Sequence, residues 1–496
     1  MLFNSYIFIF VFLPITMVGF FSLTKFRRIN AAVTWITLSS VVFYGYWNPS
    51  YLPIIITSMI VNYQVGLRIS NAKQESKRAK TLLWLGLVFN LALLGYYKYA
   101  NFFVSNLPFP AIANFIEANL NTKSIVLPLA ISFFTFQQIA YLVDAYRGET
   151  KEYNFVDYCL FVTFFPQLIA GPIVHHKEII PQFRKARTFL FSHKSMALGL
   201  AMFTLGLSKK VLIADNISPW VAPVFNHASS VSFIEAWAGA ISYTLQLYFD
   251  FSGYSDMAIG LGLMFNVQLS YNFDSPYKAT SISDFWRRWH ITLSNFLRDY
   301  LYIPLGGSRR GEIRRYGNLL LTMLLGGLWH GAGWTFVLWG GLHGLYLCIN
   351  HGWRQLKKPL PKFVAWIITF LAVIVAWVLF RAPNLHDATE ILQAMAGMKG
   401  VVLPGEAQGR LAALTQFGVQ LRSWKDLIYF PEVNGNKFLS LVVLFGLMLG
   451  VTLLPNTQEI LKKLKPTWGW ALWIGILASL SLLSLNRVSE FLYFQF

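Results

Sequence analysis

The sequence predicts an all-α polytopic membrane protein. Hydrophobic residues make up 55% of its 496 residues and charged residues only 13%, and the mean hydropathy is +0.48. A water-soluble protein of this size needs more polar surface than that. The net charge of +19 comes from short Lys and Arg clusters between apolar spans, which is typical of cytoplasmic loops. We therefore expect contact with the lipid bilayer and none with nucleic acid.

The N-terminal third predicts a series of membrane helices. Residues 2–23 are apolar and are followed, not preceded, by cations, so we expect a retained first helix with its N-terminus outside the cytoplasm. A basic cytoplasmic loop at 68–80 and an external loop at 105–125 separate later spans. These further spans are predicted at 31–47, 51–68, 81–104 and 126–147.

Two segments in the middle of the chain combine apolar residues with features that interrupt a helix. Residues 155–174 contain Pro166 and Pro172 and predict a broken or re-entrant helix. The span at 196–216 carries Lys209 and Lys210 within its apolar run. These lysines either extend to the membrane interface or pair with acids inside the membrane.

Acidic and basic residues follow at membrane depth. Residues 233–265 predict two helices joined through DFSGYSD, which holds the pocket candidates Asp250, Tyr254 and Asp256. Buried acids need partners. The segment 284–315 is too charged for a free span and too apolar for a soluble loop, and it supplies several arginines. It reads either as a helix that offers them to an anionic group or as an interfacial helix without a ligand.

His330 lies within an apolar stretch, 319–349, that contains no acidic or basic residue other than histidine. A helix beginning near Asn318 would place it about 18 Å deep at roughly 1.5 Å per residue. An ionisable group at that depth indicates a functional site, although a neutral structural imidazole is the alternative. Seven glycines here predict close packing or opened backbone. Three tryptophans are expected to surround the histidine: Trp329, Trp334 and Trp339.

The C-terminal part predicts spans at 363–380, 437–454 and 467–486 around a long external segment at 382–436 with an amphipathic piece at 388–398. The C-terminus then falls outside the cytoplasm. We expect one integral membrane domain with N-terminal helices in 1–150, a catalytic core in 151–350 and C-terminal helices in 351–496. No nucleotide-binding motif is present, and the cysteines, Cys159 and Cys348, lie in apolar runs. We expect neither a metal nor a bound cofactor.

Three stretches resemble the membrane-bound O-acyltransferase superfamily, and most closely its bacterial alginate O-acetyltransferase branch. They are YFDFSGYSDMAIGLGLMF at 248–265, SISDFWRRWHITLSNFLRDYLYIPLGGSRRG at 281–311 and GGLWHGAGWTFVLWGGLHG at 326–344. FFPQLIAGPIVHH and LGLSKKVLIAD extend the resemblance upstream. It implies a fold of about 11–13 membrane helices, some broken, around a central tunnel. One departure is Asn266, where Gly is expected after the MF pair.

The resemblance also implies a reaction and the residues that perform it. His330 matches the superfamily's catalytic histidine and His290 its second polar position. A hydroxyl acceptor would lose its proton to His330 as it attacks a cytosolic thioester, acetyl-CoA in this branch. His290 or a tryptophan N–H would orient the imidazole or hold the thioester oxygen. The candidates for binding the donor's phosphates are Arg287, Arg288, Arg309 and Arg310.

Tyr493, in the terminal sequence FLYFQF, carries the only hydroxyl of that tail. It could accept the acyl group and pass it to a periplasmic acetyltransferase or esterase-like partner, or the tail could only anchor the last helix at the interface. We expect a bacterial inner-membrane enzyme that O-acetylates alginate or another exopolysaccharide through that partner. Peptidoglycan O-acetylation and D-alanyl transfer to teichoic acid are alternatives, and a transporter or channel is the alternative from another class.

Overall fold

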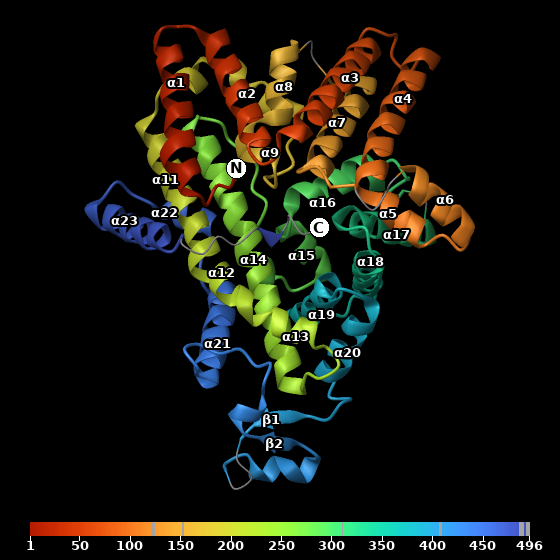
Figure 1. Ribbon diagram of the computed structural model, residues 1–496, viewed down its shortest axis with the longest axis vertical. Helices are drawn as coiled ribbons and strands as arrows, with labels where there is room; N and C mark the ends of the chain where they lie inside the picture. The colour runs from red at the N-terminus through yellow and green to blue at the C-terminus, as the bar shows by residue number, and fades with distance from the viewer. Residues whose placement is uncertain (121–124, 151–152, 310, 406–408, 486–490, 493–496) are drawn as a thin grey trace. The chain divides into compact units, whose positions relative to one another are not determined.

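The computed structural model describes the chain except for residues 121–124, 151–152, 310, 406–408, 486–490 and 493–496 (Figure 1). It divides into two compact units, each assembled from segments distant in sequence. The first comprises Met1–Leu207, Tyr254–Asn272 and Pro466–Val488. The second comprises Ser208–Gly253, Phe273–Lys465 and Ser489–Phe496. The expectation of a single membrane domain stays a prediction.

The first unit is a bundle of helices with short connections. Its N-terminal helices are α1 (Leu13–Lys25), α2 (Ile29–Gly45), α3 (Leu52–Ser70), α4 (Lys77–Leu94), α5 (Ala100–Ser105), α6 (Pro110–Leu120) and α7 (Ile131–Tyr146). Then follow α8 (Phe155–Thr163), α9 (Phe165–Leu168), α10 (His176–Ile179), α11 (His193–Ser208), the second part of α14 (Phe233–Met264) and α23 (Trp468–Leu483). The helices α3, α4 and α7 stand side by side (Figure 1).

Hydrogen bonds between buried polar side chains fix how α3, α4 and α7 pack. The Asn90 side-chain amide donates to Asn62 Oδ1 at 2.6 Å, and the Gln138 amide donates to Ser58 Oγ at 3.0 Å. All four side chains are buried. Hydrogen bonds between helices in an apolar environment satisfy groups that would otherwise be costly to bury, so they specify one register.

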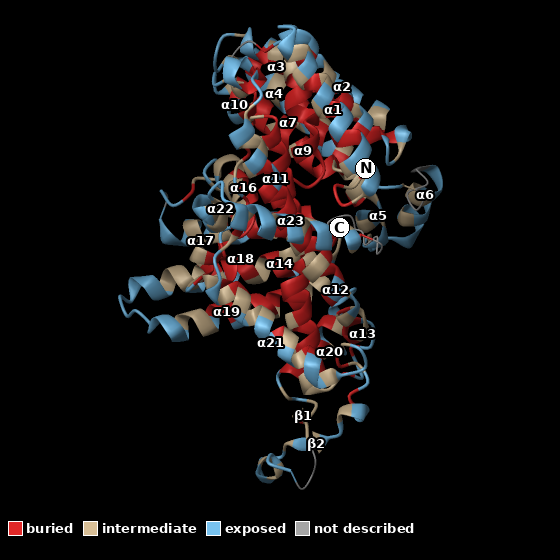
Figure 2. Ribbon diagram, turned by 90° about the vertical axis from the view of Figure 1, so that its left-hand side faces the viewer, coloured by how far each residue is buried: buried red, intermediate tan, exposed pale blue. Residues whose placement is uncertain are grey.

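Two predictions for the first unit can be compared with the structure: the external loop at 105–125 and the broken helix at 155–174. The external loop predicted at 105–125 contains the helix α6, which is largely exposed (Figure 2). Its Pro110 stands at the first helical position, where the missing N–H is harmless. The broken helix predicted at 155–174 is confirmed. α8 ends at Thr163, α9 adds about one turn with Pro166 near its start, and the chain then leaves the helical conformation.

The second unit holds most residues that the sequence analysis singled out. Its helices are α12 (Asp215–Ile217), α13 (Ala222–Asn226), the first part of α14, α15 (Ile282–Arg288), α16 (Ile291–Leu297), α17 (Glu312–His330), α18 (Trp334–Gln355), α19 (Lys362–Arg381), α20 (Leu385–Met395), α21 (Lys437–Leu453) and α22 (Thr457–Lys463). Two short parallel strands, β1 (Val402–Pro404) and β2 (Gln420–Arg422), lie in the predicted external segment. The amphipathic piece predicted there is α20.

Among the described residues, five helices are long and apolar enough to cross a membrane, or six if the bent pair α21 and α22 is one span. The helices α2 and α23 are shorter and apolar. The pair α21 and α22 bends by 61°, because Pro455 stops α21 and Asn456 begins α22 with a capping box. The predicted all-α membrane class is confirmed, while the count of about 11–13 membrane helices stays a prediction.

The prediction of two helices in 233–265 is wrong. α14 is one helix of 32 residues, which corresponds to about 48 Å. It runs through DFSGYSD because the buried Asp250 carboxylate is met by the Lys210 ammonium at 2.5 Å. With its charge compensated, the acid does not have to leave the helix for water.

Candidate active site

His330 is the last residue of α17, and the chain reverses directly after it. Gly331 and Gly333 have extended backbone, and α18 begins at Trp334. The stretch 319–349 therefore forms a helical hairpin. His330 stands where the unpaired carbonyl groups of α17 give partial negative charge, which stabilises an imidazolium formed there.

Glycines bring the two helices of this hairpin into backbone contact. A Cβ added at Gly327 would lie 2.2 Å from the carbonyl oxygen of Phe336, and one at Gly340 would lie 2.2 Å from that of Met323. Gly327 faces Phe336 and Met323 faces Gly340, so the residue numbers fall along α17 as they rise along α18. α18 therefore returns antiparallel along α17. Both sequence-based interpretations of the glycines hold, close packing at Gly327 and Gly340 and opened backbone at Gly331 and Gly333.

Aromatic rings enclose the His330 side chain, of which 6% is exposed. Its ring centroid lies 5.0 Å from that of Trp329, 5.1 Å from that of Trp339 and 5.4 Å from that of Phe380. The His290 ring follows at 6.3 Å. Within this second unit the structure thus brings both predicted histidines together, although 40 residues separate them in the sequence.

His290 connects α15 and α16 and lies outside the helices that are candidates for crossing the membrane. Its φ of 43° is in the left-handed region, which a non-glycine residue adopts at a cost in free energy. Its side chain is fully buried, with the Phe251 ring edge-on at 4.8 Å. This burial lowers the pKa of His290 to about 3. His290 is therefore neutral at neutral pH.

The tryptophans predicted to surround His330 behave differently from one another. Trp329 and Trp339 are buried, whereas 52% of Trp334 is exposed, so its predicted place in the wall is wrong. Trp334 starts α18 at the open end of the hairpin reversal. Phe380, from α19, packs against the imidazole, and only the tertiary contact identifies it.

A buried ionic cluster joins α14 to the C-terminal tail inside the second unit. The Lys210 ammonium lies 2.8 Å from the Asp215 carboxylate and 2.5 Å from that of Asp250. The Leu492 backbone N–H donates to the other oxygen of Asp250 at 3.2 Å, and the Phe491 ring lies 4.6 Å from the ammonium. Pairing with intramembrane acids is thus the correct alternative for Lys210.

The remaining pocket candidates lie elsewhere. Tyr254 and Asp256 are buried on the part of α14 that belongs to the first unit. The Tyr254 ring stacks on Phe3 at 4.8 Å. Tyr493 lies outside the described residues.

A basic cluster forms where α17 begins and α18 ends. An Arg315 Nη donates to His351 Nδ1. Burial first, and then the charges of Arg315, Arg354 and Arg287, lower the pKa of His351. Of these four residues the sequence indicated only Arg287 as a donor-binding candidate. The others are brought together by the antiparallel pairing of α17 with α18, which the sequence does not show.

The other predicted donor-binding arginines that the structure describes, Arg288 and Arg309, have different surroundings. Arg288 Nε donates to Asp284 at 2.9 Å, and its charge also faces Asp274 at 4.0 Å. Arg309 is exposed, and Arg310 lies outside the described residues. Arg287 is therefore the member of the predicted set that belongs to a basic cluster.

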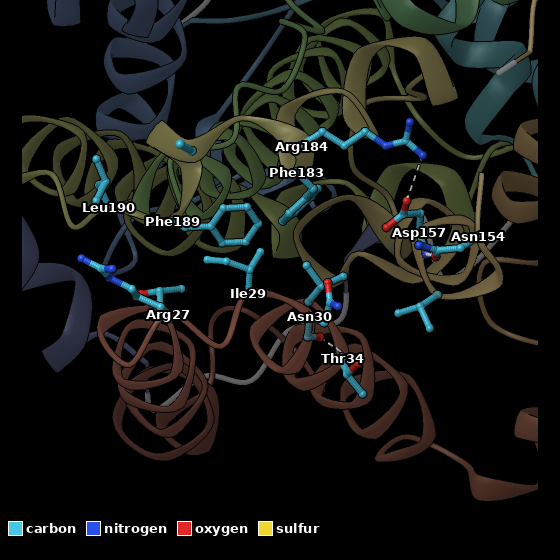
Figure 3. Close-up of a pocket in the computed structure, with 14 residues that line it drawn as sticks. Arg27, Ile29, Asn30, Thr34, Asn154, Asp157, Phe183, Arg184, Phe189 and Leu190 are labelled. Carbon is cyan, nitrogen blue, oxygen red and sulfur yellow. Dashed lines mark hydrogen bonds and ion pairs between the residues drawn. The ribbon is translucent and has the colours of Figure 1, made fainter. Parts of the chain in front are cut away.

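A pocket of about 900 Å³ lies in the first unit, lined by α1, α2, α8 and the segment before α11. Figure 3 shows Arg184 turned toward Asp157 on one side and Arg27 on the other. Arg184 is neutralised by Asp157 at 3.2 Å. None of the predicted site residues lines this pocket.

Comparison with known proteins places both histidines inside one family match. Residues 122–386 match the family described as MBOAT, membrane-bound O-acyltransferase. The peptidoglycan O-acetyltransferase of Helicobacter pylori is 48% identical over 437 residues, 81% of each chain. The chain belongs to the membrane-bound O-acyltransferase family. It is therefore a multi-pass membrane acyltransferase, and the transporter or channel alternative finds no support.

Two further relatives of this acyltransferase differ in how much they share with it. The probable alginate O-acetylase of Azotobacter vinelandii is 45% identical over 400 residues, 80% of this chain and 78% of its own. The teichoic acid D-alanyltransferase of Streptococcus thermophilus is 27% identical over 267 residues, 51% of this chain and 64% of its own. The similarity is thus much stronger to proteins named for O-acetyl transfer.

The acyltransferase keeps the local backbone at its one noted departure from the alginate branch. Asn266 has φ 59°, a conformation that glycine adopts freely and that asparagine tolerates better than other residues. Its side-chain amide donates to the carbonyl of Leu190 at 2.5 Å. Asparagine therefore preserves the turn that glycine would make.

Proposed function

We propose that this acyltransferase moves an acetyl group from a cytosolic thioester, acetyl-CoA, through a transmembrane tunnel to an outward-facing hydroxyl. One observation carries the proposal: His330 is held at the end of α17 in an aromatic enclosure with His290 as its neighbour. An imidazole that is excluded from bulk water and fixed by packing is well suited to general-base catalysis.

The proposed reaction conserves atoms and charge. The acceptor oxygen attacks the carbonyl carbon of the thioester, and its proton passes to His330. The C–S bond then breaks, the acetyl oxygen ester remains, and the leaving thiolate takes the proton from the imidazolium. His290, which burial keeps neutral, orients the groups around His330 without adding a charge.

The donor's phosphates would bind the basic cluster of Arg287, Arg315 and Arg354. Guanidinium groups bind phosphates through paired hydrogen bonds. In the proposed topology this end of the α17–α18 hairpin faces the cytosol, because basic residues concentrate there. Arg288, Arg309 and Arg310 are further donor-binding candidates from the sequence.

Tyr493 is the proposed acyl carrier. Leu492, the residue before Tyr493, donates its backbone N–H to Asp250. Phe251, which follows Asp250 in the sequence, contacts His290. These contacts link Leu492, the last described residue of the tail, to the part of α14 that touches His290, and this supports the choice of Tyr493 as the carrier. From Tyr493 the acetyl group would pass to a periplasmic acetyltransferase or esterase-like partner. This topology puts both termini on the periplasmic side of a bacterial inner membrane.

The final acceptor is proposed to be a polysaccharide. Alginate or another exopolysaccharide is supported by the relative from Azotobacter vinelandii. Peptidoglycan is the second candidate, because the Helicobacter pylori relative has similar coverage and slightly higher identity. D-alanyl transfer to teichoic acid is less supported, since that relative matches about half of this chain.

The test is acetyl release from labelled acetyl-CoA by the purified protein in detergent. His330→Gln keeps a polar side chain of similar size but cannot take the proton, so turnover should fall by about 10²-fold or more. His386→Gln is the matched control, because His386 is exposed on α20. A folded His330→Gln protein with near-normal turnover would remove this residue from the mechanism.

A further inference from the structure

A third histidine, His343, is buried in the aromatic cluster beside His330. It lies on α18 and is fully buried. The Trp286 Nε1–H, from α15, donates to His343 Nδ1 at 3.3 Å. A ring nitrogen that accepts a hydrogen bond carries no proton, so His343 is the neutral tautomer with its hydrogen on Nε2.

Several buried N–H groups in this cluster find no acceptor among the described residues, and two of them lie on α18. These two are Nε2 of His343 and Nε1 of Trp339, and Trp339 is 1% exposed. The residues are four apart on α18 and therefore share one face of the helix, with ring centroids 4.9 Å apart. Buried donors without acceptors are rare in proteins because each costs free energy.

Trp339 also touches the proposed base. Its ring lies edge-on to His330 at 5.1 Å. The ring of Trp339 thus contacts both histidines, all within the second unit. A group bound by these donors would lie beside the reacting centre rather than in a remote part of the fold.

The surroundings decide what kind of acceptor fits. A water molecule brings two hydrogens of its own and needs two to four polar partners. Around the donors stand the rings of Phe285, Trp377 and Phe380, and His343 Nδ1 is already occupied by Trp286. A carbonyl oxygen accepts hydrogen bonds and brings no hydrogen, so it fits this donor pair better than water.

We propose that Trp339 Nε1–H and His343 Nε2–H bind the carbonyl oxygen of the acyl thioester. This inference rests on the proposed function. When the acceptor oxygen bonds to the carbonyl carbon, the C=O electron pair moves onto that oxygen, and the two donors stabilise the charge. The pair returns as the C–S bond breaks. Trp286 is then a positioning residue, because it sets the tautomer that makes His343 a donor.

Trp339→Phe tests the first donor, since it keeps an aromatic ring and removes only the N–H. The turnover number on acetyl-CoA should fall by about 10²–10³-fold, a larger factor than the rise in KM. Trp237→Phe is the matched control. It also removes an indole donor, one bonded to the Met395 carbonyl at 3.0 Å, and should keep wild-type turnover.

A ligand pair isolates the carbonyl itself. S-acetonyl-CoA keeps a carbonyl but cannot transfer its acyl group, and S-propyl-CoA carries a methylene instead. Wild-type protein should bind the acetonyl analogue more tightly, and Trp339→Phe should lose that preference. Equal binding of the two analogues by wild-type protein would overturn the proposal.

Two substitutions test the second donor, His343. Comparing them separates the loss of the N–H group from a loss of folding. His343→Gln retains an N–H donor and should keep most of the turnover, whereas His343→Leu should lose about as much as Trp339→Phe. Equal losses in both would indicate a packing role and overturn the proposal. If wild-type protein releases no acetyl group from acetyl-CoA, the proposed function itself fails. If it does, and folded Trp339→Phe matches it, only this inference fails.

Discussion

The close contact between α17 and α18 leads to a prediction for Gly327, because the structure leaves no room for a side chain at this position. In Gly327→Ala the new Cβ would lie 2.2 Å from the Phe336 carbonyl oxygen. Ordinary contact begins at 3.4 Å, so the helices must separate by 3.4 − 2.2, about 1.2 Å. The obstacle is backbone and cannot rotate away. Overpacking of this kind costs about 1–3 kcal/mol of stability.

The same displacement reaches the candidate base. His330 follows Gly327 by three residues on the same helix and moves with it relative to Trp339 and Phe380. A misplacement of about 1 Å can reduce turnover by about 10²-fold. We expect Gly327→Ala to lower both the thermal unfolding midpoint in detergent and the rate of acetyl release from acetyl-CoA.

Gly317→Ala is the control on the same helix. Nothing lies within 4 Å of a Cβ added at Gly317, and alanine favours a helix over glycine by about 1 kcal/mol. This variant should be at least as stable as wild type and equally active. If Gly327→Ala also kept wild-type stability and turnover, the hairpin packing would not fix the position of His330.

Three further predictions concern charges in the second unit. Lys210→Met removes the ammonium group that lies between the buried carboxylates of Asp215 and Asp250 and should cost about 3–5 kcal/mol. The lowered unfolding midpoint should recover when Asp215 and Asp250 also become Asn, and Lys209→Met should change it little. Arg354→Gln should raise KM for acetyl-CoA about 10-fold and leave KM for S-acetyl pantetheine, which lacks the nucleotide phosphates, unchanged. An equal rise for both donors would exclude a phosphate contact. The pKa of His290 is lowered from 6.5 to about 3 by burial, so the unfolded chain binds a proton that the folded protein does not. Stability should therefore fall as the pH drops from about 7 toward 4. His290→Gln should show a smaller fall in the unfolding midpoint, and an identical pH dependence would contradict the buried neutral ring.

Much of the class and part of the site could be predicted from residues alone. The low charge content and apolar runs determine a membrane protein, since no packing rearrangement can hide that much apolar surface from water. Pro166 interrupts the helix at 155–174 whatever other segments pack against it. His330 is selected by residue type and setting and His290 by the family resemblance, and the structure brings their rings to 6.3 Å.

The tertiary structure decided what depends on partners distant in sequence. The reversal after His330 follows from glycine contacts between α17 and α18, and the continuity of α14 follows from Lys210 meeting Asp250. The basic cluster around His351 and the bond from Trp286 to His343 likewise join separate helices. A local pattern records how apolar or charged a segment is. Which charge is neutralised, and which N–H is left to bind something else, is determined only when the helices pack.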